Sequence, residues 1–179
     1  RADADTAKTL TTAPTVLTIA GVIEHDQDDL AIAETDLRAA RAAVGGEFNC
    51  TAASYLARVL VKQARWPDAA AAFEGTMDCY DRRASLGEQE IARLRADSTA
   101  RAGHAGFVLF VGRRLAQQTA EVAELRRSYH VAAFNGASAR ARLGELARAR
   151  ELLAIAGRDP ERAEQVARLH QALNARAPR

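Results

Sequence analysis

The chain is built mostly from residues that favour helices, and this composition constrains its fold more than any other feature. Alanine alone accounts for 42 of the 179 residues, and leucine, arginine, glutamate and glutamine supply much of the rest. Runs of β-branched residues are scarce. The hydrophobic fraction of 48% is high enough for a buried core, but no apolar run approaches the about 20 residues that cross a bilayer. We therefore predict an all-α fold without a membrane-spanning segment.

Prolines and glycines mark where the helices begin and end. Pro14, Pro67 and Pro160 each precede an apolar-periodic stretch, and a proline in the first turn costs no intrahelical hydrogen bond. Gly45 and Gly157 follow such stretches and are typical of helix ends. The predicted helices span residues 14–25, 29–44, 49–64, 67–97, 105–142, 146–156 and 160–174. Short helices joined by brief turns pack as antiparallel hairpins, because none can bury its apolar stripe alone.

Large and small side chains follow a defined order between Tyr55 and Met77. The positions are held by Tyr55, Leu56, Ala57, Leu60, Ala64, Trp66, Ala69, Phe73 and Met77. This order resembles the tetratricopeptide repeat, in which large residues of a first helix face small residues and one bulky residue of a second. Weaker copies flank it, upstream at Leu17, Gly21, Leu30, Ala33, Leu37 and Ala40, and downstream at Phe134, Asn135, Ala137, Gly144, Leu146, Ala149, Leu153 and Ala156.

The resemblance implies a short α-solenoid of stacked antiparallel hairpins. We expect repeats at about 14–46, 50–81 and 130–160, a capping helix at 160–175 and a flexible N-terminus at 1–13, so that residues 14–179 form a single domain. Small residues would lie where helices approach most closely. Six positions fit this role: Gly21, Ala33, Ala57, Ala69, Ala137 and Ala149. An alanine-rich helical bundle without repeats is the alternative.

The spacing of the copies predicts a helical-hairpin insertion at about 82–129. Trp66 and Leu146 hold matching positions 80 residues apart, whereas directly stacked copies would be about 34 residues apart. Apolar residues recur there at alternating steps of four and three, which is typical of a coiled-coil seam. The seams are Phe73, Met77, Tyr80, Ala84, Gly87, Ile91 and Leu94, and Val108, Val111, Leu115, Gln118, Val122, Leu125, Tyr129 and Ala132. We expect the two helices to pair as an antiparallel arm that projects past the stack.

The most apolar run of the chain, Phe107 to Val111, falls near the far end of this expected arm. The seams account for only part of the run, so Phe107, Leu109 and Phe110 need another partner. That partner is a second copy, a client protein, or the rest of this chain if the arm folds back.

The two cysteines are placed at matched ends of one expected hairpin. Cys50 begins its first helix, and Cys79 lies where the second helix passes the same level. We favour a disulfide over two free buried thiols. A bridge would indicate an oxidising compartment, so we expect a periplasmic bacterial or secreted protein, and a cytoplasmic one if the thiols are free.

The residues predict no catalytic centre, cofactor or metal site. The four histidines stand far apart, without cysteine or acidic partners at ligand spacing. No glycine-rich phosphate loop, nucleophile elbow or Cys–His pair occurs. The net charge is only +2, and basic and acidic residues are interleaved along most of the chain, so we expect no nucleic-acid partner.

The resemblance therefore implies a noncatalytic interaction scaffold or adaptor, which binds a peptide or protein surface in a concave groove lined by first helices. The groove positions are held by Thr18, Val22, Ser54, Tyr55, Arg58, Lys62, Asn135, Ser138 and Arg142. Arg58, Lys62 and Arg142 favour an acidic or carboxylate-bearing segment. Phe107 and Phe110 would add a contact on the arm. The alternatives are a self-assembling structural protein that dimerises through the arm, and a small-ligand binding module.

Overall fold

The computed structural model describes residues 13–100 and 105–175, except for the side chains of Ala105 and Phe107. Within these ranges all regular structure is helical, which confirms the all-α prediction. The helices are α2 (Pro14–Asp26), α3 (Leu30–Ala42), α4 (Cys50–Lys62), α5 (Trp66–Ala100), α6 (Ala105–Arg142), α7 (Leu146–Ala156) and α8 (Ala163–Ala175), with the 3-10 turns η1 (Gly46–Phe48) and η2 (Pro160–Arg162). Apart from Ala13, the expected flexible N-terminus lies outside the described residues.

The prolines open helical segments as predicted, with one difference. Pro14 is the first residue of α2, and Pro67 is the second residue of α5. Pro160 opens η2 rather than an α-helix, because the Asp159 carboxylate accepts a hydrogen bond of 3.1 Å from the backbone N–H of Glu161 and tightens this turn. The final α-helix therefore begins three residues later, at Ala163.

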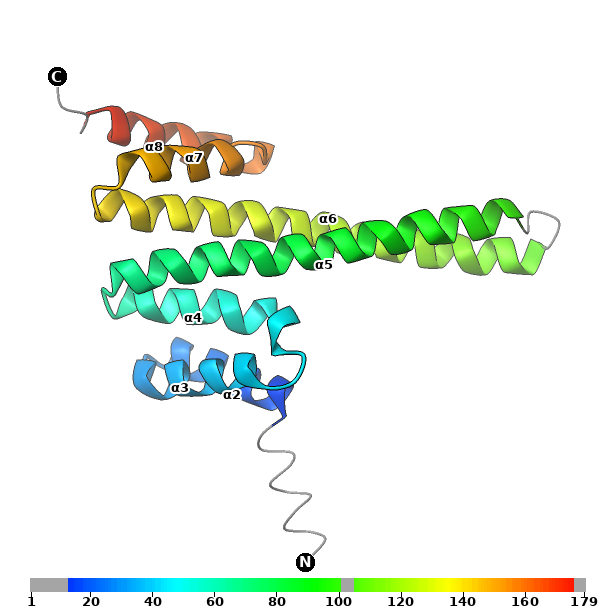
Figure 1. Ribbon diagram of the computed structural model, residues 1–179, viewed down its shortest axis with the longest axis horizontal. Coiled ribbons are helices and arrows are strands. Elements are labelled where there is room, and N and C mark those ends of the chain that lie inside the picture. The colour runs from blue at the N-terminus through cyan, green and yellow to red at the C-terminus, as the bar shows by residue number, and fades with distance from the viewer. Residues whose placement is uncertain (1–12, 101–104, 176–179) are drawn as a thin grey trace, which may run out of the picture.

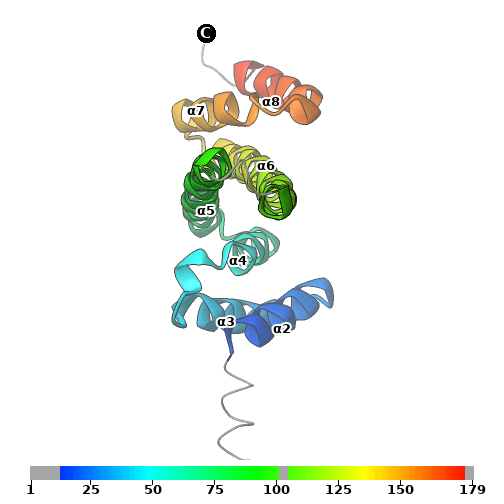
Figure 2. The ribbon, with the colours of Figure 1, turned by 90° about the vertical axis from the view of Figure 1, so that its right-hand side faces the viewer.

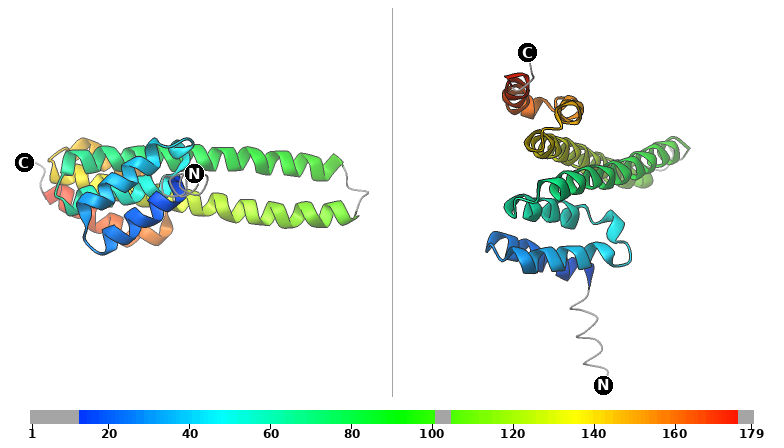
Figure 3. Two further views of the ribbon diagram at one scale, coloured as in Figure 1. Left: turned by 90° about the horizontal axis from the view of Figure 1, so that it is seen from below. Right: turned by 60° about the vertical axis from the view of Figure 1, so that its left-hand side comes forward.

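The helices are layered in chain order. Figure 1 shows α2 and α3 at one end, then α4, then the pair α5 and α6, and finally α7 and α8, and Figure 2 shows the same succession from the side. Each helix packs mainly on its neighbours in the chain, while α4 also contacts α2 and α8 also contacts α6. Beyond this stack, α5 and α6 continue side by side as a long arm (Figures 1 and 3).

Small residues lie at the close contacts between helices. Gly21 is buried, and five of the predicted alanines are completely buried: Ala33, Ala57, Ala69, Ala137 and Ala149. A Cβ atom on Gly21 would lie only 2.6 Å from Cγ of Leu37. The α2 and α3 backbones thus approach closely enough to exclude a side chain at this point.

The arm is held by the predicted seam. Ala84, Ile91, Val122 and Leu125 form its buried core, with Tyr80 and Leu115 packed against them. Ion pairs between the two helices flank this core. Arg83 pairs with Glu121, and Arg126 pairs with both Asp81 and Glu88.

Although α5 and α6 are long, no helix within residues 13–100 or 105–175 is both long enough and apolar enough to cross a membrane.

The disulfide is confirmed. Cys50 at the start of α4 and Cys79 in α5 are bridged, with 5.5 Å between their Cα atoms. Both residues are almost completely buried. The bridge closes a loop of 29 residues and joins the two helices of the hairpin at its far end from the α4–α5 turn.

Removing the bridge is expected to lower the stability of the fold. For Cys50→Ala/Cys79→Ala we expect the free energy of unfolding to fall by about 3 to 4 kcal/mol, because a loop of this size restricts the unfolded chain. Urea unfolding followed by circular dichroism measures the loss. Reductant should destabilise the wild type to a similar extent and leave the double variant unaffected. Equal midpoints for the oxidised and reduced wild type would contradict this prediction.

A matched pair of glycine substitutions tests the close packing of the arm. A Cβ at Gly87 would lie 2.4 Å from Cγ2 of Val122, whereas nothing lies within 4 Å of a Cβ at Gly112. We expect Gly112→Ala to stabilise the protein by up to about 1 kcal/mol through helix propensity. Gly87→Ala should destabilise it by about 1 to 2 kcal/mol, because overpacking outweighs the same gain. Thermal unfolding would contradict this explanation if both variants were stabilised alike.

Candidate functional site

A groove of about 520 Å³ lies between α4 and α6, and we call it the α4–α6 groove. The end of α2 and the start of α5 contribute the rest of its wall. The lining residues are His25 from α2, Arg58, Val61 and Lys62 from α4, Trp66 and Phe73 from α5, and Asn135, Ser138, Ala139 and Arg142 from α6. Five predicted groove residues, Arg58, Lys62, Asn135, Ser138 and Arg142, are thus brought together from positions up to 84 residues apart.

The Arg58 side of the groove is ordered by aromatic contacts. The Arg58 guanidinium lies 5.0 Å from the centre of the Tyr55 ring. That ring meets His25 edge to face, with 5.3 Å between ring centres. Tyr55 therefore supports two residues of the groove from behind, although it does not line the groove itself.

The opposite side of the groove is also ordered by an arginine that lies over an aromatic ring. The Arg142 guanidinium lies 4.4 Å from the centre of the Trp66 ring, which is half-buried at the start of α5. Both arginines are exposed, and within the described part of the chain neither forms an ion pair. The groove thus presents two guanidiniums that are positioned by rings rather than neutralised by carboxylates.

Lys62 differs from the two arginines, because its amine forms hydrogen bonds with other residues of the same chain. Its Nζ donates to the backbone oxygen of His25 at 2.9 Å and to Oδ1 of Asp28 at 2.6 Å. The hydrogen bond and positive charge of Lys62 hold the pKa of Asp28 below its ordinary value. Lys62 therefore fixes the turn between α2 and α3 against α4.

The floor of the groove is mostly apolar. Phe73 is 2% exposed, and Val61 and Ala139 lie on either side of it in the α4 and α6 walls. The Ser138 hydroxyl donates to the backbone oxygen of Phe134 in its own helix at 3.0 Å. The groove therefore combines an apolar floor with cationic groups at its opening.

The remaining predicted groove residues lie elsewhere. Thr18 is 8% exposed; its hydroxyl donates to the Pro14 backbone oxygen at 2.6 Å and accepts from the Asn49 side chain at 2.7 Å. It therefore ties α2 to the start of α4. Val22 and Ser54 are half-buried and do not line the α4–α6 groove.

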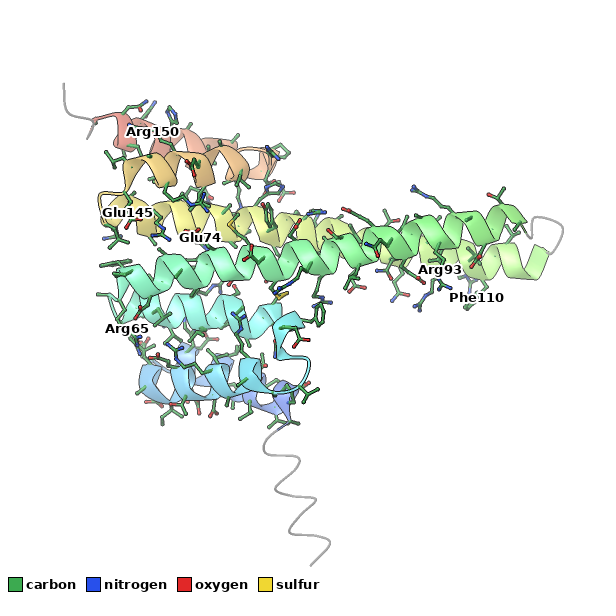
Figure 4. The ribbon with its side chains drawn as sticks, viewed as in Figure 1. Arg65, Glu74, Arg93, Phe110, Glu145 and Arg150 are labelled. Atoms are coloured by element: carbon green, nitrogen blue, oxygen red, sulfur yellow. A yellow bond between two sulfur atoms is a disulfide. The ribbon has the colours of Figure 1, made fainter. Side chains whose placement is uncertain are left out.

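The α6 wall is fixed by a cluster of charges around Glu74. This carboxylate pairs with Arg140 of α6 and Arg148 of α7, each at 2.7 Å, and Arg140 also pairs with Glu145. Figure 4 shows Glu74 and Glu145 in the stack, away from the arm. Partial burial raises the pKa of Glu74, but the guanidiniums of Arg148 and Arg140 outweigh this effect and hold that pKa below its ordinary value. The cluster thus joins three helices beside the groove.

A second cluster of charged side chains fixes the other side of the groove. Arg65, between α4 and α5, pairs with Glu34 of α3 at 2.8 Å and with Asp68 of α5 at 2.6 Å (Figure 4). Arg38 binds the same Glu34 carboxylate. These contacts set the position of α3 relative to the turn that carries Trp66.

The apolar run on the arm forms a separate candidate surface. Val111 is buried in the seam, whereas Leu109 and Phe110 are each 66% exposed and Val108 is 38% exposed. The alternative that the arm folds back and buries this run is wrong for Leu109 and Phe110. The reason is the length of the paired helices, which carries these residues beyond the stack (Figure 4). The side chain of Phe107 lies outside the described residues.

Five of the residues that line the groove were not predicted from the sequence: His25, Val61, Trp66, Phe73 and Ala139. Trp66 and Phe73 were predicted only as positions of the repeat pattern, and no role was predicted for His25. Trp66 lies beside a turn, where a side chain is often only half-buried, and this position could have indicated its place in the groove. His25 carried no such signal, because its place depends on how the end of α2 packs on α4.

Within the described ranges, no group of three or more histidine, cysteine, aspartate or glutamate side chains is placed so that it could hold a metal ion.

No family model matches this chain, and neither the curated proteins nor the solved structures contain a match.

Glu74→Gln tests the charge cluster. The pKa of Glu74 is lower in the folded protein than in the unfolded chain, so its contribution is present above the unfolded pKa and is lost as the pH falls through the folded pKa. We expect the variant to be less stable than the wild type by about 1 to 2 kcal/mol at pH 7. Urea unfolding at several pH values should show the two proteins converging below the folded pKa. A difference that persisted at low pH would contradict the ionic explanation.

Proposed function

We propose that this protein is a noncatalytic scaffold of the tetratricopeptide-repeat type, which binds an acidic peptide segment in the α4–α6 groove. The observation that carries the proposal is the pair of ring-stacked guanidiniums, Arg58 and Arg142, above an apolar floor. Carboxylates are the groups that such planar, fixed cations recognise best.

The repeat-type arrangement is supported by the order of helices and by their contacts. Antiparallel hairpins follow one another along the stack, and fully buried alanines lie at the positions that the resemblance assigns to small residues. The groove is lined chiefly by α4 and α6, which hold the expected first-helix positions of the second and third repeats. In this proposal residues 82–129 are an insertion that lengthens α5 and α6.

The form of the groove favours a peptide over a small ligand. Its volume of about 520 Å³ would suit either, but its two arginines are exposed to solvent at its opening. A peptide can place an acidic side chain against each arginine and an apolar side chain over Phe73. Buried, converging polar groups would be needed for an enclosed ligand, and here Ser138 and Lys62 are used within the chain.

The disulfide supports an oxidising location. Bridges of this kind persist outside the reducing cytosol, so we propose a periplasmic or secreted protein.

The test uses the only tryptophan of the chain, which lies in the groove. A displayed random-peptide library selected on the full chain should be enriched in acidic peptides, and their binding should change the fluorescence of Trp66, because a bound peptide displaces water from the groove that this ring lines. We expect Arg142→Glu and Arg58→Glu each to weaken binding by about tenfold to a hundredfold, through loss of a charge-assisted hydrogen bond.

Arg158→Glu is the matched control, because Arg158 is exposed outside this groove and the change in net charge is the same. It should leave the affinity of the selected peptides within about twofold of the wild type. Selection of peptides without acidic residues, or equal losses in all three variants, would overturn the groove proposal.

A further inference from the structure

We propose that the free end of the α5–α6 arm docks on an anionic lipid surface. In this arrangement Leu109 and Phe110 enter the interface between headgroups and acyl chains, and nearby arginines meet the phosphates. This is a second site, independent of the α4–α6 groove.

The apolar part of this surface is the outer face of α6. Leu109 and Phe110 are each two-thirds exposed, whereas Val111, the next residue, is 2% exposed in the seam. Figure 4 shows Phe110 near the end of the arm, with its side chain directed away from the helix pair. Adjacent large apolar side chains with this exposure are unfavourable in water and need a partner.

The charge of the arm identifies the kind of partner. Residues 82–129 contain nine arginines and five acidic residues, a net charge of +4, whereas the whole chain carries only +2. The rest of the chain is therefore net negative, at −2. Four of these acidic residues, Glu88, Glu90, Glu121 and Glu124, lie in the half of the arm nearer the stack. Asp97 alone lies near the free end, and no acidic residue occurs from Ser98 to Ala120. Positive charge and exposed apolar side chains thus gather at the same end of the molecule.

The order of the residues along the arm matches the layers of a membrane surface. Arg113 and Arg114 follow Phe110 by three and four residues, so they lie on the same side of α6, about 5 Å further from the tip. Gly87 packs next to Val122, and this antiparallel register places Arg95 of α5 level with Arg114. All three arginines are exposed. Apolar side chains ahead of a ring of cations are typical of interfacial docking at a depth of about 5 to 10 Å.

The arm can reach such a surface without obstruction. Figures 1 and 3 show its free end as the most distant part of the helices, well beyond the stack. A flat surface can therefore touch the tip while the stack stays clear of it.

A second copy of the chain is a poorer partner. Two identical tips would bring Arg95, Arg113 and Arg114 of one chain close to the same residues of the other, and like charges at short range are unfavourable. An anionic bilayer neutralises the arginines and covers the apolar residues in one step.

The experiment is cosedimentation of the full chain with vesicles. We expect binding to vesicles of phosphatidylcholine and phosphatidylglycerol in equal parts, weaker binding as ionic strength rises, and little binding to pure phosphatidylcholine. Arg113→Glu/Arg114→Glu should lower the partition coefficient by about thirtyfold or more, since each lost arginine removes about 1 kcal/mol. Leu109→Ser/Phe110→Ser should lower it by about tenfold or more.

Two control variants make matched changes elsewhere. Arg158→Glu/Arg168→Glu reverses two exposed charges at the α7–α8 end, and Ile32→Ser/Val44→Ser removes two exposed apolar side chains near α3. Both controls should retain binding within about threefold, and circular dichroism should show unchanged helix content throughout. Failure of the wild type to bind anionic vesicles, or equal losses in tip and control variants, would overturn the proposal. So would dimerisation lost in Leu109→Ser/Phe110→Ser without vesicle binding, which would identify a second copy as the partner.

Discussion

The close approach of helix backbones is the constraint on which the rest of this structure depends. Gly21 leaves no room for a Cβ against Leu37, and Ala33, Ala57 and Ala149 are completely buried between helices. Alanines make up 15 of the 31 buried apolar residues within the described ranges. Each of them buries little apolar area, so stability comes from many contacts along the chain. The buried disulfide and the ion pairs of Glu34 and Glu74 add further links between helices.

The same constraint produces the groove. Closely packed helices set their exposed faces in regular positions, so long side chains from α4 and α6 project into one space. An arginine in such a place would lose much of its conformational freedom on binding a partner. Stacking on Tyr55 and Trp66 holds Arg58 and Arg142 before any partner arrives, which lowers that entropic cost while leaving their donors available.

Much of the fold could be predicted from the sequence, because its determinants are local. Proline positions and apolar periodicity gave helix boundaries within a few residues, and the three-four spacing gave the seam of the arm. The disulfide followed from hairpin geometry. The details of the groove did not, because they depend on contacts distant in sequence. Lys62 binds Asp28, which is 34 residues away, and Arg140 binds Glu74, which is 66 residues away. The spacing of residues within one helix does not predict which residues of other helices they contact.

One uninterrupted helix connects the two candidate sites. Phe110 near the start of α6 and Arg142 at its end are separated by 32 residues, which corresponds to about 48 Å along a straight helix. No proline interrupts α6, and its seam with α5 and its packing on α7 and α8 support both halves. If both proposals hold, the arm acts as a spacer of fixed length, so that a peptide bound in the groove is held at a set distance from a membrane surface. Lengthening or shortening the seam by whole heptads would change this distance without altering either site, because each heptad restores the same face of both helices to the contact.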